Sequence, residues 1–114
     1  MNSLNLVETL QRRVIQDFMD IFILAEMKEC SLSGYDCIGF IHRRFDLLVS
    51  SGTVYSLLYS MERDGWIRGV WNERKRVYEL TEKGELDMKL IAKVNEEVQI
   101  FLGNISFLNV TVNR

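Results

Sequence analysis

The side chains that could do chemistry lie mainly in the middle third of the 114-residue chain. Three consecutive cations, Arg74-Lys75-Arg76, stand between two short apolar runs. Upstream of them lies a set of hydroxyl-bearing, aromatic and small residues, followed by one cation: Ser51, Gly52, Thr53, Tyr55, Ser56, Tyr59 and Arg63. Cations and hydroxyl donors bind phosphate oxygens. This composition predicts a surface that binds an anion.

The charge distribution also indicates an anion-binding surface. The formal net charge is −2, yet residues 43–78 carry seven basic and four acidic side chains. Residues 1–42 and residues 79–113 each carry three basic and six acidic ones. A basic middle in an acidic protein is typical of localised anion binding. Chance bias on a solvated face stays open as an alternative, because the excess is modest.

Other kinds of site find little support in the sequence. Cys30, Cys37 and the single histidine, His42, are too few ligands for a structural zinc site. There is no glycine-rich phosphate loop and no carboxylate pair in an apolar setting, so we expect no enzymatic activity, metal or cofactor. The longest apolar run, Ile21–Ala25, is far too short to cross a membrane, and no signal-peptide pattern is present. We therefore expect a cytoplasmic protein.

The polar residues between 51 and 63 require a helix to carry them. Val54, Leu57, Leu58 and Met61 have the spacing of one helix face, which predicts a helix over Ser51–Asp64. Ser50 or Ser51 would cap this helix and Gly65 would end it. The polar set then occupies the opposite face.

A second helix is predicted just before it, over Gly34–Phe45, with Ser33 as its cap. Its inward residues would be Tyr35, Ile38 and Ile41, with Phe45 as a further candidate. The connector to the next helix carries three apolar residues that we expect to plug the core: Leu47, Leu48 and Val49.

After Gly65 the pattern changes from helix to strand. Trp66–Trp71 and Arg76–Thr81 are rich in aromatic and β-branched residues, and the polar stretch Asn72–Lys75 lies between them. This predicts a β-hairpin with the three cations at its tip.

Long helices are predicted at both ends. Residues 4–28 read as one helix that is apolar on two sides, so that one side packs on its own domain and the other requires a partner. A final helix should open near Thr81 and run to about Leu108. Its apolar residues are alternately three and four positions apart: Ile91, Val94, Val98, Phe101, Ile105, Leu108 and Val112. This seam predicts dimerisation, and the alternative is that the helix folds back onto its own domain.

Three helices, a hairpin and a long helix follow the order of a winged helix-turn-helix, a mainly α fold with a small β-hairpin. We expect residues 1–81 to form the winged-helix domain and residues 82–114 the dimerisation helix, together as one compact unit.

Several segments also resemble a known family. Gly34-Tyr35-Asp36, the runs 51–58 and 61–67, and Arg74–Thr81 with Gly84 are similar to the PadR-like transcriptional regulators. The resemblance covers about residues 20–86 in unbroken order. It implies a winged helix that binds operator DNA as a homodimer, usually as a repressor, and it places Tyr35 near the phosphate backbone. The chain departs from the family at Asn72-Glu73, where members often carry glycine or proline.

Duplex DNA offers a major groove that admits a helix, and phosphates that attract cations. We therefore expect contacts from Tyr35, from the polar set Ser51, Gly52, Thr53, Tyr55, Ser56, Tyr59 and Arg63, and from Arg74, Lys75 and Arg76. A dimer would read an inverted repeat. Two alternatives stay open: a winged helix that binds proteins instead of DNA, and a dimer that senses an unidentified small molecule in a cavity between its subunits, edged by Trp71 or Phe18.

Overall fold

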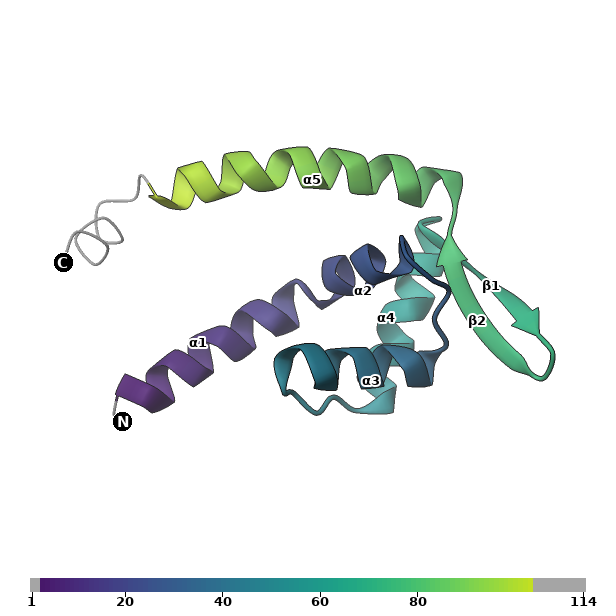
Figure 1. Ribbon diagram of the computed structural model, residues 1–114, viewed down its shortest axis with the longest axis horizontal. Helices are drawn as coiled ribbons and strands as arrows, with labels where there is room; N and C mark the ends of the chain where they lie inside the picture. The colour runs from purple at the N-terminus through teal and green to yellow at the C-terminus, as the bar shows by residue number, and fades with distance from the viewer. Residues whose placement is uncertain (1–2, 104–114) are drawn as a thin grey trace.

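A computed structural model describes residues 3–103 of the chain (Figure 1). The elements follow in the order α1 (Ser3–Asp17), α2 (Met19–Met27), α3 (Gly34–Phe45), α4 (Ser51–Arg63), β1 (Ile67–Asn72), β2 (Lys75–Leu80) and α5 (Glu82–Gly103). The fold is mainly helical with one antiparallel hairpin, as the sequence predicts. Ile105, Leu108 and Val112 of the predicted seam lie outside the described residues.

Helices α2, α3 and α4 and the hairpin form the body of the molecule, while α1 and α5 both leave it on the side opposite the hairpin (Figure 1). The longest axis is 54 Å because of these two helices. The centre of the core combines residues from α2, α3, α4 and β2, all fully buried: Ile23, Leu24, Cys37, Ile41, Val54, Leu58 and Tyr78.

The N-terminal helix is not continuous, contrary to our prediction of one helix over residues 4–28. The backbone breaks at Phe18, whose φ of −113° and ψ of 15° are not helical. Met19 and Ile23 beyond the break are buried in the core, whereas Leu10 and Val14 before it are exposed. The break therefore lets α2 pack on the body while α1 departs from it.

Helix α3 begins as predicted, with Ser33 as its cap. The Ser33 hydroxyl oxygen accepts from the Asp36 N–H at 3.0 Å, and Asp36 Oδ2 accepts from the Ser33 N–H at 3.0 Å. The predicted inward position of Tyr35 is wrong, because its side chain is 79% exposed. Gly34, Cys37 and Ile41 form the buried face instead, and the next residue in a helix points about 100° away from such a face.

The connector between α3 and α4 is only partly buried. Leu47 and Val49 pack against the core as expected. Leu48 lies between them and is 80% exposed, so the prediction that it plugs the core is wrong. Its two neighbours face the core, and in this non-helical segment Leu48 faces away from it.

Helix α4 matches its prediction closely. The Ser50 hydroxyl oxygen accepts from the Thr53 N–H at 3.1 Å and so caps the helix. Val54, Leu58 and Met61 are buried. Gly65 follows the helix with a φ of 84°, in the left-handed region that favours glycine.

The hairpin is tighter than predicted. Asn72 pairs with Lys75, so the loop is Glu73-Arg74 alone. Lys75 and Arg76 belong to β2, and the prediction that all three cations occupy the tip is therefore wrong. The φ of 59° at Glu73 permits this two-residue turn without a glycine or proline.

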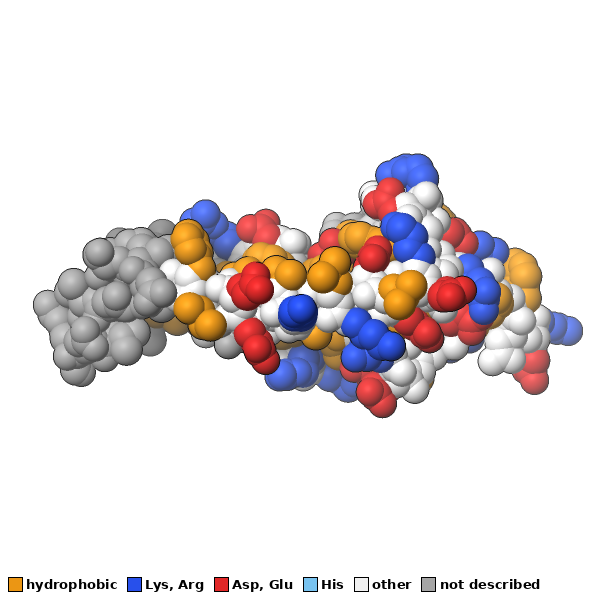
Figure 2. All heavy atoms as spheres, turned by 90° about the horizontal axis from the view of Figure 1, so that it is seen from above, with side chains coloured by type: hydrophobic (Ala, Val, Ile, Leu, Met, Phe, Trp, Pro, Cys, Tyr) orange, Lys and Arg blue, Asp and Glu red, His pale blue; other side chains and the backbone are white. Residues whose placement is uncertain are grey.

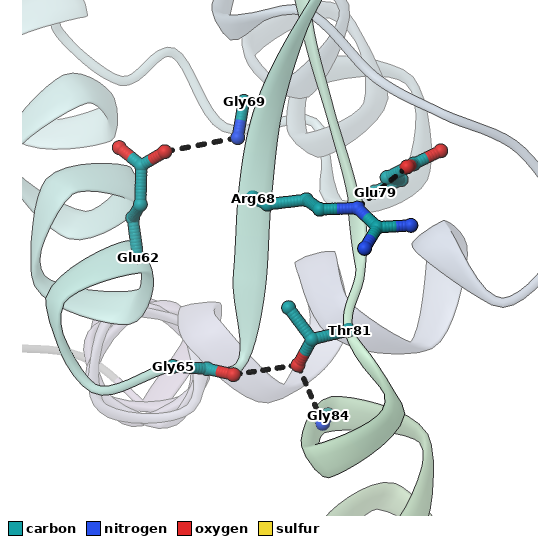
Figure 3. Close-up of polar contacts among 7 residues, drawn as sticks. All are labelled: Glu62, Gly65, Arg68, Gly69, Glu79, Thr81 and Gly84. Carbon is teal, nitrogen blue, oxygen red and sulfur yellow. Dashed lines mark hydrogen bonds and ion pairs between the residues drawn. The ribbon is translucent and has the colours of Figure 1, made fainter.

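Helix α5 is joined to the body through Thr81. The Thr81 hydroxyl donates to the carbonyl oxygen of Gly65 and accepts from the N–H of Gly84, as Figure 3 shows. The indole N–H of Trp66 donates to Asp87 Oδ2 at 2.9 Å. The first turns of α5 are thus bonded directly to the segment that follows α4.

Candidate nucleic-acid interface

The outer face of α4 carries the polar set predicted from the sequence. All seven of these residues are exposed: Ser51, Gly52, Thr53, Tyr55, Ser56, Tyr59 and Arg63. The face exists because Val54, Leu58 and Met61 bury the opposite one. The rings of Tyr55 and Tyr59, one turn apart, lie with their centroids 6.2 Å from each other.

A hollow lies between α4, the start of α3 and β2. It has a volume of about 440 Å³ and is lined by Ser33, Tyr35, Tyr55, Tyr59, Lys75, Arg76 and Tyr78. Five of the predicted contact residues therefore line one hollow, although they come from three elements. It is not lined by the other six, which are five residues of α4 and one of the hairpin loop: Ser51, Gly52, Thr53, Ser56, Arg63 and Arg74.

The cations of the hairpin differ in their surroundings. Arg74 stands in the exposed loop. Lys75 Nζ lies 3.3 Å from Asp36 Oδ2, and Arg76 Nη2 lies 3.1 Å from Glu62 Oε2. The pKa of Arg76 is raised above its usual value, chiefly by the side chain of Tyr78 and also by the charge of Glu62, so this residue remains a cation.

Two acidic residues of the interface, Asp36 and Glu62, were missed by the reasoning from sequence. The pKa of Asp36 is lowered, chiefly by the hydrogen bond from the backbone N–H of Ser33, with smaller contributions from the Ser33 hydroxyl and Lys75. The spacing of Ser33 and Asp36 could have revealed this capping box. Glu62 follows Tyr59 by three positions, but its partners depend on how the hairpin packs.

A second feature is the apolar surface of the two protruding helices. On α1 and at its end, Leu6, Val7, Leu10, Val14 and Phe18 are exposed. On α5, the exposed apolar residues are Leu86, Leu90, Val94, Val98, Ile100 and Phe101. Figure 2 shows apolar side chains along the outer face of α5.

The predicted seam is therefore only part of the apolar surface of α5. Ile91 is half-buried against the core, while Val94, Val98 and Phe101 are exposed. Leu86 and Leu90 were not predicted, although their spacing of four residues indicates a shared helix face. Ile105 and Leu108 lie outside the described residues.

The described part of the chain offers no cluster of three or more His, Cys, Asp or Glu side chains that could hold a metal ion. None of the helices in residues 3–103 combines the length and apolar character needed to span a membrane.

Comparison with known proteins identifies related chains. Residues 23–90 match the model of the transcriptional regulator PadR-like family. None of the curated proteins compared with the chain matches it.

Solved structures share the fold. A PadR family transcription regulator from Clostridium difficile is 25% identical, with a TM-score of 0.66 over 80% of this chain and 98% of that one. A transcriptional regulator from Clostridium thermocellum is 24% identical, with a TM-score of 0.71 over 82% and 94%. A PadR-like regulator from Bacillus cereus is 20% identical, with a TM-score of 0.72 over 81% and 94%.

Proposed function

The chain belongs to the PadR-like family of transcriptional regulators, and from this premise we propose that it binds duplex DNA as a homodimer and represses transcription from an inverted-repeat operator. The observation that carries the proposal is the outer face of α4. This face is exposed, holds no acidic residue between Ser51 and Tyr59, and adjoins the cations of β2.

In this proposal α4 enters the major groove, which is wide enough for a helix. Small residues at its start, Ser51 to Thr53, let the backbone approach the DNA, and the free N–H groups of the first turn favour a phosphate. Tyr55 offers its hydroxyl to a phosphate and its ring to a sugar or a thymine methyl. Tyr35, which is exposed at the start of α3, contacts the phosphate backbone beside α4.

The hairpin supplies charge. Arg74 in the loop reaches the phosphates or the minor groove next to the groove that α4 occupies. Lys75 and Arg76 lie closer to α4 and line the hollow with the tyrosines. This arrangement assigns base contacts to α4 and phosphate affinity mainly to the hairpin.

Dimerisation is the second part of the proposal. Residues 1–81 contain the DNA-binding elements, and residues 82–114 form the dimer together with α1. The support is the exposed apolar surface of α1 and α5, which exceeds the scattered apolar residues usual on a monomer. Two copies of α4 related by a two-fold axis would then enter major grooves about 34 Å apart.

The test is a mobility-shift titration on a duplex selected by the unmodified protein from a random pool. Tyr55→Ala and Arg74→Ala should each weaken binding, and sizing chromatography should show an intact dimer. Arg68→Ala is the matched control, because Arg68 lies on the same hairpin and pairs with Glu79 at 2.8 Å. Failure of the unmodified protein to bind any duplex at low salt would favour a protein-binding role, and unchanged affinity in both variants would refute the contact assignments.

A further inference from the structure

Glu62 connects α4 to the hairpin through a single oxygen atom. Its Oε2 accepts from the backbone N–H of Gly69 at 2.9 Å and from Arg76 Nη2 at 3.1 Å. Figure 3 shows the bond to Gly69, which runs from the helix to the middle of β1. The two acceptor contacts tie both strands of the hairpin to one residue of α4.

The amide of Gly69 needs an acceptor outside the hairpin. Gly69 pairs with Tyr78, but both backbone groups of Tyr78 are bonded to Leu32 on the other side of β2. In an antiparallel pair of this kind the facing residue also turns its backbone groups outward. The N–H of Gly69 therefore points away from β2 and donates a hydrogen bond to the carboxylate of Glu62.

The absence of a side chain at Gly69 places Arg76 in reach of Glu62. A Cβ atom at Gly69 would lie 2.4 Å from the guanidinium of Arg76. The same guanidinium lies 5.6 Å from the centroid of the buried Tyr78 ring. Gly69, Tyr78 and Glu62 together thus fix where the Arg76 cation stands.

From these contacts we propose that Glu62 is a positioning residue that sets the angle of the hairpin relative to α4 and so raises sequence-specific affinity for DNA. The proposal rests on the proposed function, because it concerns how α4 and the hairpin reach the same duplex. A hairpin fixed in place does not lose conformational freedom on binding, and this preorganisation increases affinity.

Simple electrostatics predicts the opposite effect of Glu62, namely that it weakens binding to DNA. Glu62 is an acidic residue beside a phosphate-binding surface and neutralises one of its cations. If that were its only effect, removing its charge would strengthen binding to every duplex, because more counterions would be released. The sign of the change in affinity therefore distinguishes positioning from masking.

The first experiment compares Glu62→Ala with Glu62→Gln on the selected duplex and on an unrelated duplex. Glu62→Ala should bind the selected duplex about 10-fold more weakly, the loss expected for one charge-assisted hydrogen bond to a backbone amide, with unchanged affinity for the unrelated one. Glu62→Gln should retain affinity within about 3-fold, because one amide oxygen can replace Oε2 in both contacts. Equal or tighter binding by Glu62→Ala, or an equal loss in Glu62→Gln, would overturn the proposal.

Glu79→Ala is the matched control. Glu79 is an acid of the same hairpin, its side chain is 35% exposed against 33% for Glu62, and it likewise pairs with an arginine, Arg68. It does not connect the hairpin to α4, so its removal should leave the preference for the selected duplex unchanged. A loss equal to that of Glu62→Ala would show that any acid paired with an arginine of the hairpin matters, and would refute a role specific to Glu62.

A second variant covers the case in which Glu62→Ala does not fold. Gly69→Ala keeps the backbone amide but displaces the flexible end of Arg76 from Glu62. Positioning predicts weaker binding to the selected duplex, whereas release of a masked cation predicts tighter binding. If the unmodified protein binds no duplex, the proposed function fails; if it binds and these variants do not weaken it, only the role of Glu62 fails.

Discussion

The salt dependence of DNA binding can be worked out from the ion pairs of the interface. The chain has four cations on this surface: Arg63, Arg74, Lys75 and Arg76. Lys75 and Arg76 pair with Asp36 and Glu62, whereas within residues 3–103 Arg63 and Arg74 form no ion pair. Only the unpaired cations should release counterions fully when a phosphate approaches.

For a dimer that keeps its ion pairs, four cations are unpaired, and the slope of log affinity against log salt should be about −3.6. Affinity then falls about 150-fold between 50 and 200 mM salt, following the same relation. If all eight cations engaged phosphates freely, the slope would be about −7 and the fall about 20,000-fold. The two cases are far enough apart for a titration to separate them.

In the proposed dimer, Arg74→Ala would remove one phosphate contact from each subunit. For this variant, the slope of log affinity against log salt should be about −1.8, and the affinity for DNA should fall only about 12-fold over the same salt range. Fluorescence anisotropy on a labelled duplex at four or five salt concentrations measures these slopes, with Arg68→Ala as the control that should keep the parent slope. An Arg74→Ala slope equal to that of the parent would show that Arg74 contacts no phosphate.

Three further outcomes are expected. Cys30 is exposed and should react with an aromatic disulfide reagent in the folded protein. Burial raises the pKa of Cys37 to about 12, so its thiol should react only on unfolding. Equal reactivity of the two thiols in the folded protein would contradict the placement of α3. The pKa of Asp36 is lowered from 3.8, so its carboxylate stabilises the fold above that pH. This contribution is lost as the pH falls through the lowered pKa. Urea unfolding should therefore show that Asp36→Asn is less stable than the parent protein at pH 6 but little different from it near pH 2. Val98→Asp should weaken the proposed dimer in sedimentation experiments, since burying an unpaired charge is costly. Trp71→Asp, at a more exposed apolar residue of the hairpin, should not weaken it. A dimer unaffected by Val98→Asp would refute the assignment of α5.

The parts of the fold that the sequence predicts are those set by local patterns. The α4 helix could be predicted because Val54, Leu58 and Met61 repeat at helical spacing and Ser50 precedes them as a cap. The two strands could be predicted as well, because the apolar runs Trp66–Trp71 and Arg76–Thr81 nearly coincide with β1 and β2. Each of these features depends on residues within a few positions of one another.

The errors arise where distant parts of the chain decide the structure. The break at Phe18 depends on which surface α2 covers, and the burial of Cys37 in place of Tyr35 depends on how α3 is rotated against the core. The contacts of Glu62 lie 7 and 14 residues away along the chain. They exist only once the hairpin has packed beside α4, so neither spacing nor composition indicates them.

The hydrogen bonds that join α5 to the body at Thr81 have a mechanical consequence. Helix α5 has 22 residues and is therefore about 33 Å long. A rotation of 10° at its first turn would displace its far end by about 6 Å, following from that length. In the proposed dimer, a substitution at Thr81 or Trp66 that rotates α5 should therefore change the separation of the two half-sites that the dimer can span, although neither residue would lie near a base.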